Sequence, residues 1–183
     1  MPQHFSNIEE FSNILKGYDI DLRQIDRGSF SATLQQIDCG SVFISRIATT
    51  RRMEANGNPP PGLRTFGIPT ENCQPFVWRN QHSSGNTIQI YKPNTELEMV
   101  SHPLFEVIDV SITQEYFASL NQQWGFAELD ELISDREMLV CDPVNMQQLR
   151  NALRFICVTV DRNPDMIQKS TELQNLIQHK TPY

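Results

Sequence analysis

In residues 59–69 the chain reads PPPGLRTFGIP, and this stretch decides the predicted fold. Three prolines and a glycine interrupt regular structure, because proline lacks a backbone N–H and glycine favours turns. An extended segment follows in which Arg64, Phe66 and Ile68 share one face. Strands are expected on both sides of this stretch and helices later, so we interpret it as the entry to a central strand of an antiparallel β-barrel.

Short segments with period-two alternation surround this stretch. Phe30, Ala32 and Leu34 alternate with polar residues, and a turn at residues 38–40 leads into the next such segment. About eight to ten short strands are expected in residues 19–112, with no space for helices between them. Parallel neighbours need long crossover connections, so the sheet is expected to be mostly antiparallel. A closed barrel or jelly roll would also leave few exposed strand edges.

Helical signals lie towards the two ends of the chain. Residues 7–17 predict a short N-terminal helix, and Thr113 is expected to cap a helix that follows the last strand. Asp142 and Pro143 give the clearest helix start, with aspartate as the N-cap and proline at the first helical position. The predicted fold is therefore mainly β with C-terminal helices (α+β).

The composition argues against several classes of protein. There are 15 basic and 22 acidic residues, a formal charge of -7. Free-standing nucleic-acid-binding domains usually have a basic face, so phosphate binding over the whole surface is not expected. There is no secretory-signal pattern, and no apolar stretch approaches the ~20 residues that cross a bilayer. We therefore expect a soluble cytoplasmic protein without a membrane partner.

No catalytic or metal-binding motif is evident. The four cysteines include no C-x-x-C pair and the four histidines no H-x-H pair, so neither a metal nor another cofactor is expected. There is no G-x-S-x-G elbow and no glycine-rich phosphate loop. Paired acids such as Glu96 and Glu98 are interpreted as solvated faces. The chain is not expected to be an enzyme, and no catalytic residue is assigned.

The interior of the predicted barrel is the remaining candidate site. Barrels of about eight strands hold either a packed core or a cavity for one small ligand, and both readings fit an aromatic-rich lining. Trp78 could stack on a flat ligand, and Arg46, which interrupts an apolar strand face, could anchor an acidic one. The predicted lining consists of Arg46, Arg64, Phe66, Phe76, Trp78, Ile88 and Ile90.

An apolar stripe marks the helix that begins after Asp142. Its spacing follows one helix face. A helix-turn-helix interpretation is disfavoured, because the helix is too long and Asn163-Pro164 occupies the turn that usually holds a small residue. We interpret the stripe as a packing seam, either against the barrel or against a second copy in a two-fold homodimer. Its members are Leu149, Leu153, Ile156 and Val160.

Several segments together resemble the N-terminal sensor half of AraC-type transcription regulators. They are residues 22–30, residues 40–46 and the opening stretch, and the strand at residues 107–112 followed by helices is also similar. The resemblance extends over residues 19–180. It implies a cupin-like barrel with an N-terminal helix in residues 1–112. It also implies helices in residues 113–183 that pack on the barrel or form the dimer seam.

In that family two helix-turn-helix units follow the sensor half and bind DNA. No such units are recognised here, so DNA would be reached only through a C-terminal region that is not present in this chain. The expected function is the ligand-sensing and dimerisation domain of an AraC-type regulator, with an effector of open identity. A metal-independent cupin-fold enzyme, a small-molecule-binding protein and a structural dimer module remain alternatives.

Overall fold

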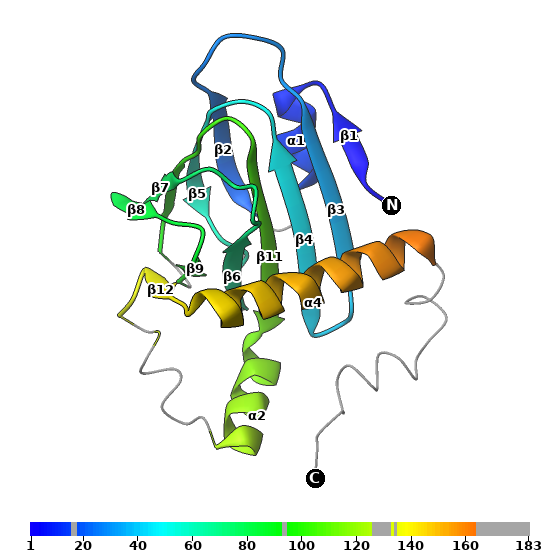
Figure 1. Cartoon of the computed structure of the whole chain (residues 1–183), viewed down its shortest axis with the longest axis vertical. Helices are drawn as coiled ribbons and strands as arrows, with labels where there is room; N and C mark the ends of the chain where they lie inside the picture. Colours follow the sequence, from blue (N-terminus) through cyan, green and yellow to red (C-terminus); the bar gives the residue numbers. More distant parts are fainter. Residues whose placement is uncertain (16–17, 93–94, 126–132, 134, 164–183) are drawn as a thin grey trace.

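The computed structural model describes residues 1–15, 18–92, 95–125, 133 and 135–163 (Figure 1). The helices of the described residues are α1 (Ile8–Ile14), α2 (Gln114–Trp124) and α4 (Pro143–Arg162). The strands are β1 (Gln3–Phe5), β2 (Asp19–Gln24), β3 (Ala32–Asp38), β4 (Val42–Thr49), β5 (Met53–Asn58), β6 (Leu63–Pro69), β7 (Phe76–Trp78), β8 (Gln81–Ser83), β9 (Thr87–Tyr91), β10 (Leu97–Val100), β11 (Phe105–Thr113) and β12 (Met138–Val140).

These strands form two antiparallel sheets that pack face to face. Within the described residues, a seven-stranded sheet has the order β1-β3-β4-β11-β6-β9-β12 and a five-stranded sheet has the order β2-β5-β10-β7-β8. The central position of β6, between β11 and β9, agrees with its prediction as a central strand. The predicted fold, mainly antiparallel β with C-terminal helices, is confirmed.

Both predicted helix starts near the C-terminal half are confirmed by their caps. The Thr113 side chain accepts a hydrogen bond from the backbone N–H of Tyr116 at the start of α2. Asp142 accepts from the backbone N–H groups of Val144 and Asn145 at the start of α4. Such caps satisfy donors that have no partner inside the helix. Residues 126–132, 134 and 164–183 of the predicted helical region lie outside the described residues.

Helix α4 lies across the outer face of the seven-stranded sheet (Figure 1). Its buried residues Met146, Leu153 and Cys157 pack in one cluster with Ile68 of β6 and Ile108 of β11. The strands beneath it are therefore covered on both faces.

The inner core lies between the two sheets, and α1 covers part of it. Phe11 of α1 is 2% exposed and packs against Phe30 with ring centroids 5.8 Å apart. Further residues of this cluster come from both sheets, among them Leu34 of β3 and Met53 of β5. The N-terminal helix and the two sheets thus enclose one interior.

Candidate functional site

Two of the predicted lining residues, Phe76 and Trp78 of β7, lie between the sheets. Phe76 meets Phe105 of β11 edge-on, with ring centroids 5.1 Å apart. Trp78 is 1% exposed and lies against Tyr91 of β9, with centroids 4.7 Å apart. Its indole N–H donates to the backbone carbonyl of Glu137 at 3.1 Å. These rings form one wall of the interior core.

Four other predicted lining residues lie on the opposite, helix-covered face of the seven-stranded sheet. Phe66 of β6 packs against Phe117 of α2 with centroids 6.1 Å apart, and the Arg64 guanidinium lies 6.0 Å from the same ring. Ile90 of β9 packs in the same cluster as Phe117. Ile88 packs in the cluster beneath α4. The structure therefore does not bring the predicted residues together into one lining.

The cause is that β6 and β9 have helices on one face and the second sheet on the other. On β6, Thr65 and Gly67 face the second sheet, and on β9, Gln89 and Tyr91 do so. On this inner face the hydroxyl groups of Thr65 and Ser111 of β11 form a hydrogen bond of 2.8 Å. Alternation shows which residues share a face of a strand, but not which face meets the other sheet.

A cavity of about 60 Å³ lies between the two sheets and α1. Its walls are mostly apolar, and they include Phe11 of α1, Leu22 of β2, Met53 of β5 and Val107 of β11. By volume it has space for about four water molecules, although apolar cavities of this kind usually stay dry. An apolar space of this kind is suited to part of a small ligand.

Asp109 of β11 places a carboxyl group at this cavity, where it is 3% exposed. Its Oδ1 accepts from the Tyr91 hydroxyl at 3.2 Å and its Oδ2 from the Tyr18 hydroxyl at 3.4 Å. Burial raises the pKa of Asp109 to about 7, although the two tyrosine hydroxyls oppose this rise. Burial also raises the pKa of both tyrosines well above its usual value, so both remain donors. Near neutral pH the carboxyl is therefore partly protonated and partly ionised.

A second acceptor lies close to Asp109. Gln89 is 1% exposed, and its Nε2 donates to Ser83 Oγ at 2.9 Å and to the Thr87 carbonyl at 3.3 Å. Its Oε1 has no hydrogen-bond partner among the described residues. Gly67 provides the space here, because a Cβ would lie 2.8 Å from Gln89 Oε1 and 3.2 Å from Asp109 Oδ1. Two acceptor oxygens therefore converge on the backbone of Gly67.

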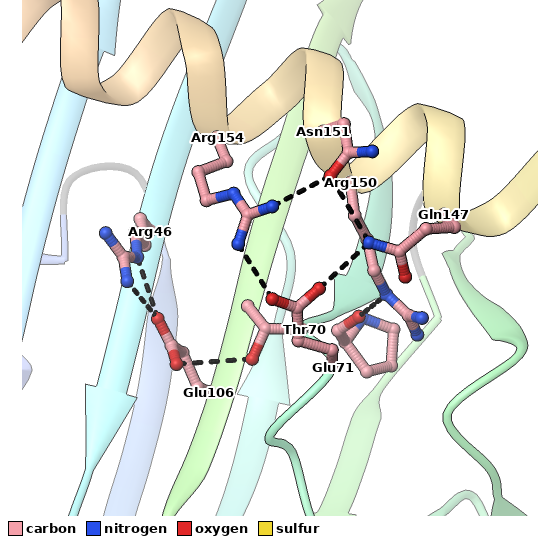
Figure 2. A network of polar contacts seen from close by, with 9 residues as sticks. Arg46, Thr70, Glu71, Glu106, Gln147, Arg150, Asn151 and Arg154 are labelled. Carbon is pink, nitrogen blue, oxygen red and sulfur yellow. Dashed lines mark hydrogen bonds and ion pairs between the residues drawn. The ribbon is translucent and has the colours of Figure 1, made fainter.

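Arg46, the remaining predicted lining residue, belongs to a polar network between α4 and the sheet (Figure 2). Its Nε donates to Glu106 Oε1 of β11 at 2.8 Å. Thr70 donates to the other oxygen of Glu106 at 3.2 Å. Arg154 of α4 forms an exposed ion pair with Glu71 at 2.7 Å. These contacts surround a polar cavity of about 70 Å³.

Arg150 ties α4 to the sheet within the same network. It is 8% exposed, and its Nε donates to the backbone carbonyl of Pro69 at 2.8 Å. A second nitrogen donates to the carbonyl of Gly85. One buried guanidinium thus anchors the helix to the end of β6 and to the loop between β8 and β9.

The predicted seam on α4 divides between two environments. Leu153 is 6% exposed against the sheet, and Leu149 and Val160 are partly buried beside it. Ile156 is 37% exposed. The outward face of α4 instead carries Phe155, which is 72% exposed and was not part of the predicted seam.

The interior polar residues were missed by sequence reasoning. Asp109 is a lone acid in the most β-branched run of the chain, residues 107–112. Its position in that run was the one feature of the sequence that could have indicated a buried acid. An acid between apolar neighbours on a strand covered on both faces must be buried. Tyr18 and Tyr91 carry no comparable local signal, because they meet Asp109 only through the tertiary fold.

Two features are absent from the part of the chain that the structure describes. No helix there is sufficiently long and apolar to cross a membrane. No cluster of three or more histidine, cysteine or acidic side chains there could hold a metal ion.

Comparisons with known proteins show a similarity of fold. No protein-family model matches the chain, and no curated protein matches it. Among solved structures, the AraC-like transcriptional activator CuxR superposes with a TM-score of 0.64 at 10% sequence identity. The match covers 97% of this chain and 67% of that one. The chain therefore has the fold of the matched part of an AraC-like activator.

Proposed function

We propose that this chain is the effector-sensing and dimerisation domain of an AraC-type transcription regulator and that it has no catalytic activity. The observation that carries the proposal is the cavity between the sheets, with the buried Asp109 at its wall. The fold shared with an AraC-like activator supports it. Contact with DNA is assigned to a helix-turn-helix region outside this chain, in keeping with the formal charge of -7.

The outward face of α4 is the proposed surface for self-association. Val144 and Phe155 are 64% and 72% exposed and lie about three helical turns apart, so they share a face. Large exposed apolar side chains that gather on one face commonly mark an interaction surface. A two-fold dimer would pair this face with its copy.

Strand β11 offers a route between the cavity and α4. Asp109 on one face of the strand lines the cavity, and Ile108 on the other face packs in the cluster beneath α4. An effector that prefers one arrangement of these elements would shift the population towards it. The two DNA-binding regions of a dimer would then be presented differently, which is the coupling that a regulator requires.

The test is a reporter fusion. Residues 1–183 are fused to a DNA-binding domain that represses its operator only as a dimer. We expect the fusion to repress and a matched Phe155→Glu fusion to repress far less at equal protein levels. A wild-type fusion that represses no better than the unfused DNA-binding domain would contradict the proposed role in dimerisation.

A further inference from the structure

The described residues that line the cavity between the sheets include one charged side chain, and it is acidic. Among the described residues that line it, Asp109 is the charged one, and hydroxyls of Tyr18, Tyr91 and Thr49 supply the other polar groups. No described arginine, lysine or histidine lines the cavity. A carboxylate or phosphate ligand would meet a like charge at low dielectric, so anionic ligands are disfavoured.

Ligands with many hydroxyl groups fit poorly as well. Each buried hydroxyl costs free energy unless it finds a hydrogen-bond partner. Both tyrosine hydroxyls already donate to Asp109, and the Thr49 hydroxyl is directed to the backbone carbonyl of Arg51 at 3.4 Å. The remaining walls are apolar, so a sugar would leave most of its hydroxyls without partners.

The carboxyl group of Asp109 still has capacity to accept hydrogen bonds. An ionised carboxylate offers about four acceptor positions. The two tyrosines occupy two of them at 3.2 and 3.4 Å, longer than the roughly 2.5–2.7 Å usual for a hydroxyl on a charged oxygen. The carboxyl group of Asp109 therefore has acceptor positions left for N–H groups of a ligand.

We propose that this cavity binds the ammonium head of a small aliphatic amine, with its N–H groups donating to Asp109 and its alkyl group against the apolar walls. This inference rests on the proposed function, since it names the chemical class of the effector. A buried carboxylate is stabilised by a paired cation. The volume of about 60 Å³ suits a group of roughly four non-hydrogen atoms, the same as the number of water molecules for which it has space.

The test compares three probes of similar shape with different head groups: isobutylamine, isobutanol and isobutyrate. Each is titrated by calorimetry into the wild type and Asp109→Asn, whose folding is checked by circular dichroism. We expect isobutylamine, protonated at neutral pH, to bind the wild type at least about tenfold more tightly than isobutanol, because its hydrogen bonds are charge-assisted. Asp109→Asn should lose this preference and keep its weak binding of isobutanol.

Ala55→Val is a second variant that leaves Asp109 intact. Ala55 of β5 lines the cavity and is 1% exposed, so two added carbon atoms should occupy part of the free volume and weaken isobutylamine and isobutanol alike. Affinity for isobutylamine should also rise from pH 6 to pH 8 in the wild type only, as Asp109 ionises. Tyr18, between α1 and β2, and Tyr91, on β9, keep their protons over this range.

Equal binding of isobutylamine and isobutanol, or a preference for isobutyrate, overturns the ammonium proposal. The cavity would then still bind a ligand, but not one recognised by an ammonium group. Binding of isobutylamine that is unchanged in Asp109→Asn also overturns it. So does the failure of all three probes to bind the folded wild type. The reporter fusion measures self-association and uses none of these probes, so a failure of the proposed function is seen separately.

Discussion

Replacing Asp109 with asparagine should flatten the pH dependence of stability. Burial raises the pKa of this carboxyl from 3.8 to about 7 in the folded state. Between about pH 4 and 7 the folded state therefore retains a proton that the unfolded state has released. Because the unfolded state binds fewer protons there, the contribution of this group to stability is full below about pH 4 and is lost as the pH rises through 7.

The expected magnitude follows from the two pKa values. A shift of about 3 pKa units at about 1.4 kcal/mol each gives a total near 4 kcal/mol. Between pH 5 and 8 the wild type should lose about 3 kcal/mol through Asp109 alone. Asparagine has no charge to bury, so the variant should lack this slope. Urea unfolding at pH 5, 6, 7 and 8 gives the difference in free energy of unfolding, in which the groups shared by both proteins cancel.

Asp21→Asn is the matched control, because Asp21 is exposed on β2. Its free energy of unfolding should run parallel to that of the wild type over the same range. If the Asp109→Asn profile also ran parallel to the wild type between pH 5 and 8, the carboxyl would not be buried with a raised pKa. The electrostatic description of the cavity would then be refuted.

Three further predictions concern α4 and the interior core. Phe155→Glu should weaken self-association in sedimentation equilibrium and change the free energy of unfolding by less than about 0.5 kcal/mol. Leu153→Glu should lower the free energy of unfolding by about 3–5 kcal/mol, because it buries a charge against the sheet. Equal stability of the two variants would contradict the orientation of α4. Arg150→Met should lower the free energy of unfolding in urea by about 2–3 kcal/mol, since two backbone carbonyls lose their donor. Arg154→Ala should lower it by less than about 1 kcal/mol, because its ion pair is exposed. A larger loss for Arg154→Ala than for Arg150→Met would contradict the role of Arg150 as the buried anchor. Trp78→Phe should lower stability by about 1–2 kcal/mol in calorimetry through loss of the indole hydrogen bond, and an unchanged melting temperature would argue against that contact.

The local elements were predictable because their signals are local. The turn chemistry of residues 59–62 and the alternation after it predicted β6, and Asp142 with Pro143 predicted the start of α4. Caps and alternation depend on residues within a few positions of each other. The mostly antiparallel arrangement followed in turn from the short connections between strands.

The assignment of strand faces was not predictable from alternation. Phe66 and Ile90 form the more apolar faces of β6 and β9, and these faces meet helices, whereas the faces with Thr65 and Gln89 meet the second sheet. A strand covered on both sides has no solvent-exposed face to serve as a reference. Sequence reasoning therefore grouped residues correctly by strand face but expected the wrong neighbours for several of them.

The polar residues of the cavity depend on long-range contacts. Asp109 meets Tyr18 and Tyr91 through hydrogen bonds between residues that are far apart in the sequence. No spacing rule connects a residue that follows α1 with residues on β9 and β11. Only the position of an acid inside a strongly β-branched run indicated that Asp109 was unusual.

Effector binding between the two sheets is tested most directly by a thermal-shift screen of small metabolites against the wild type and Ala55→Val. A ligand that binds only the folded state stabilises it by RT ln(1 + [L]/Kd), so the melting temperature rises with ligand concentration and affinity. We predict that at least one compound raises the melting temperature of the wild type and has a much smaller effect on Ala55→Val. Compounds that shift both proteins equally, or a library that shifts neither, would contradict an effector site in this cavity.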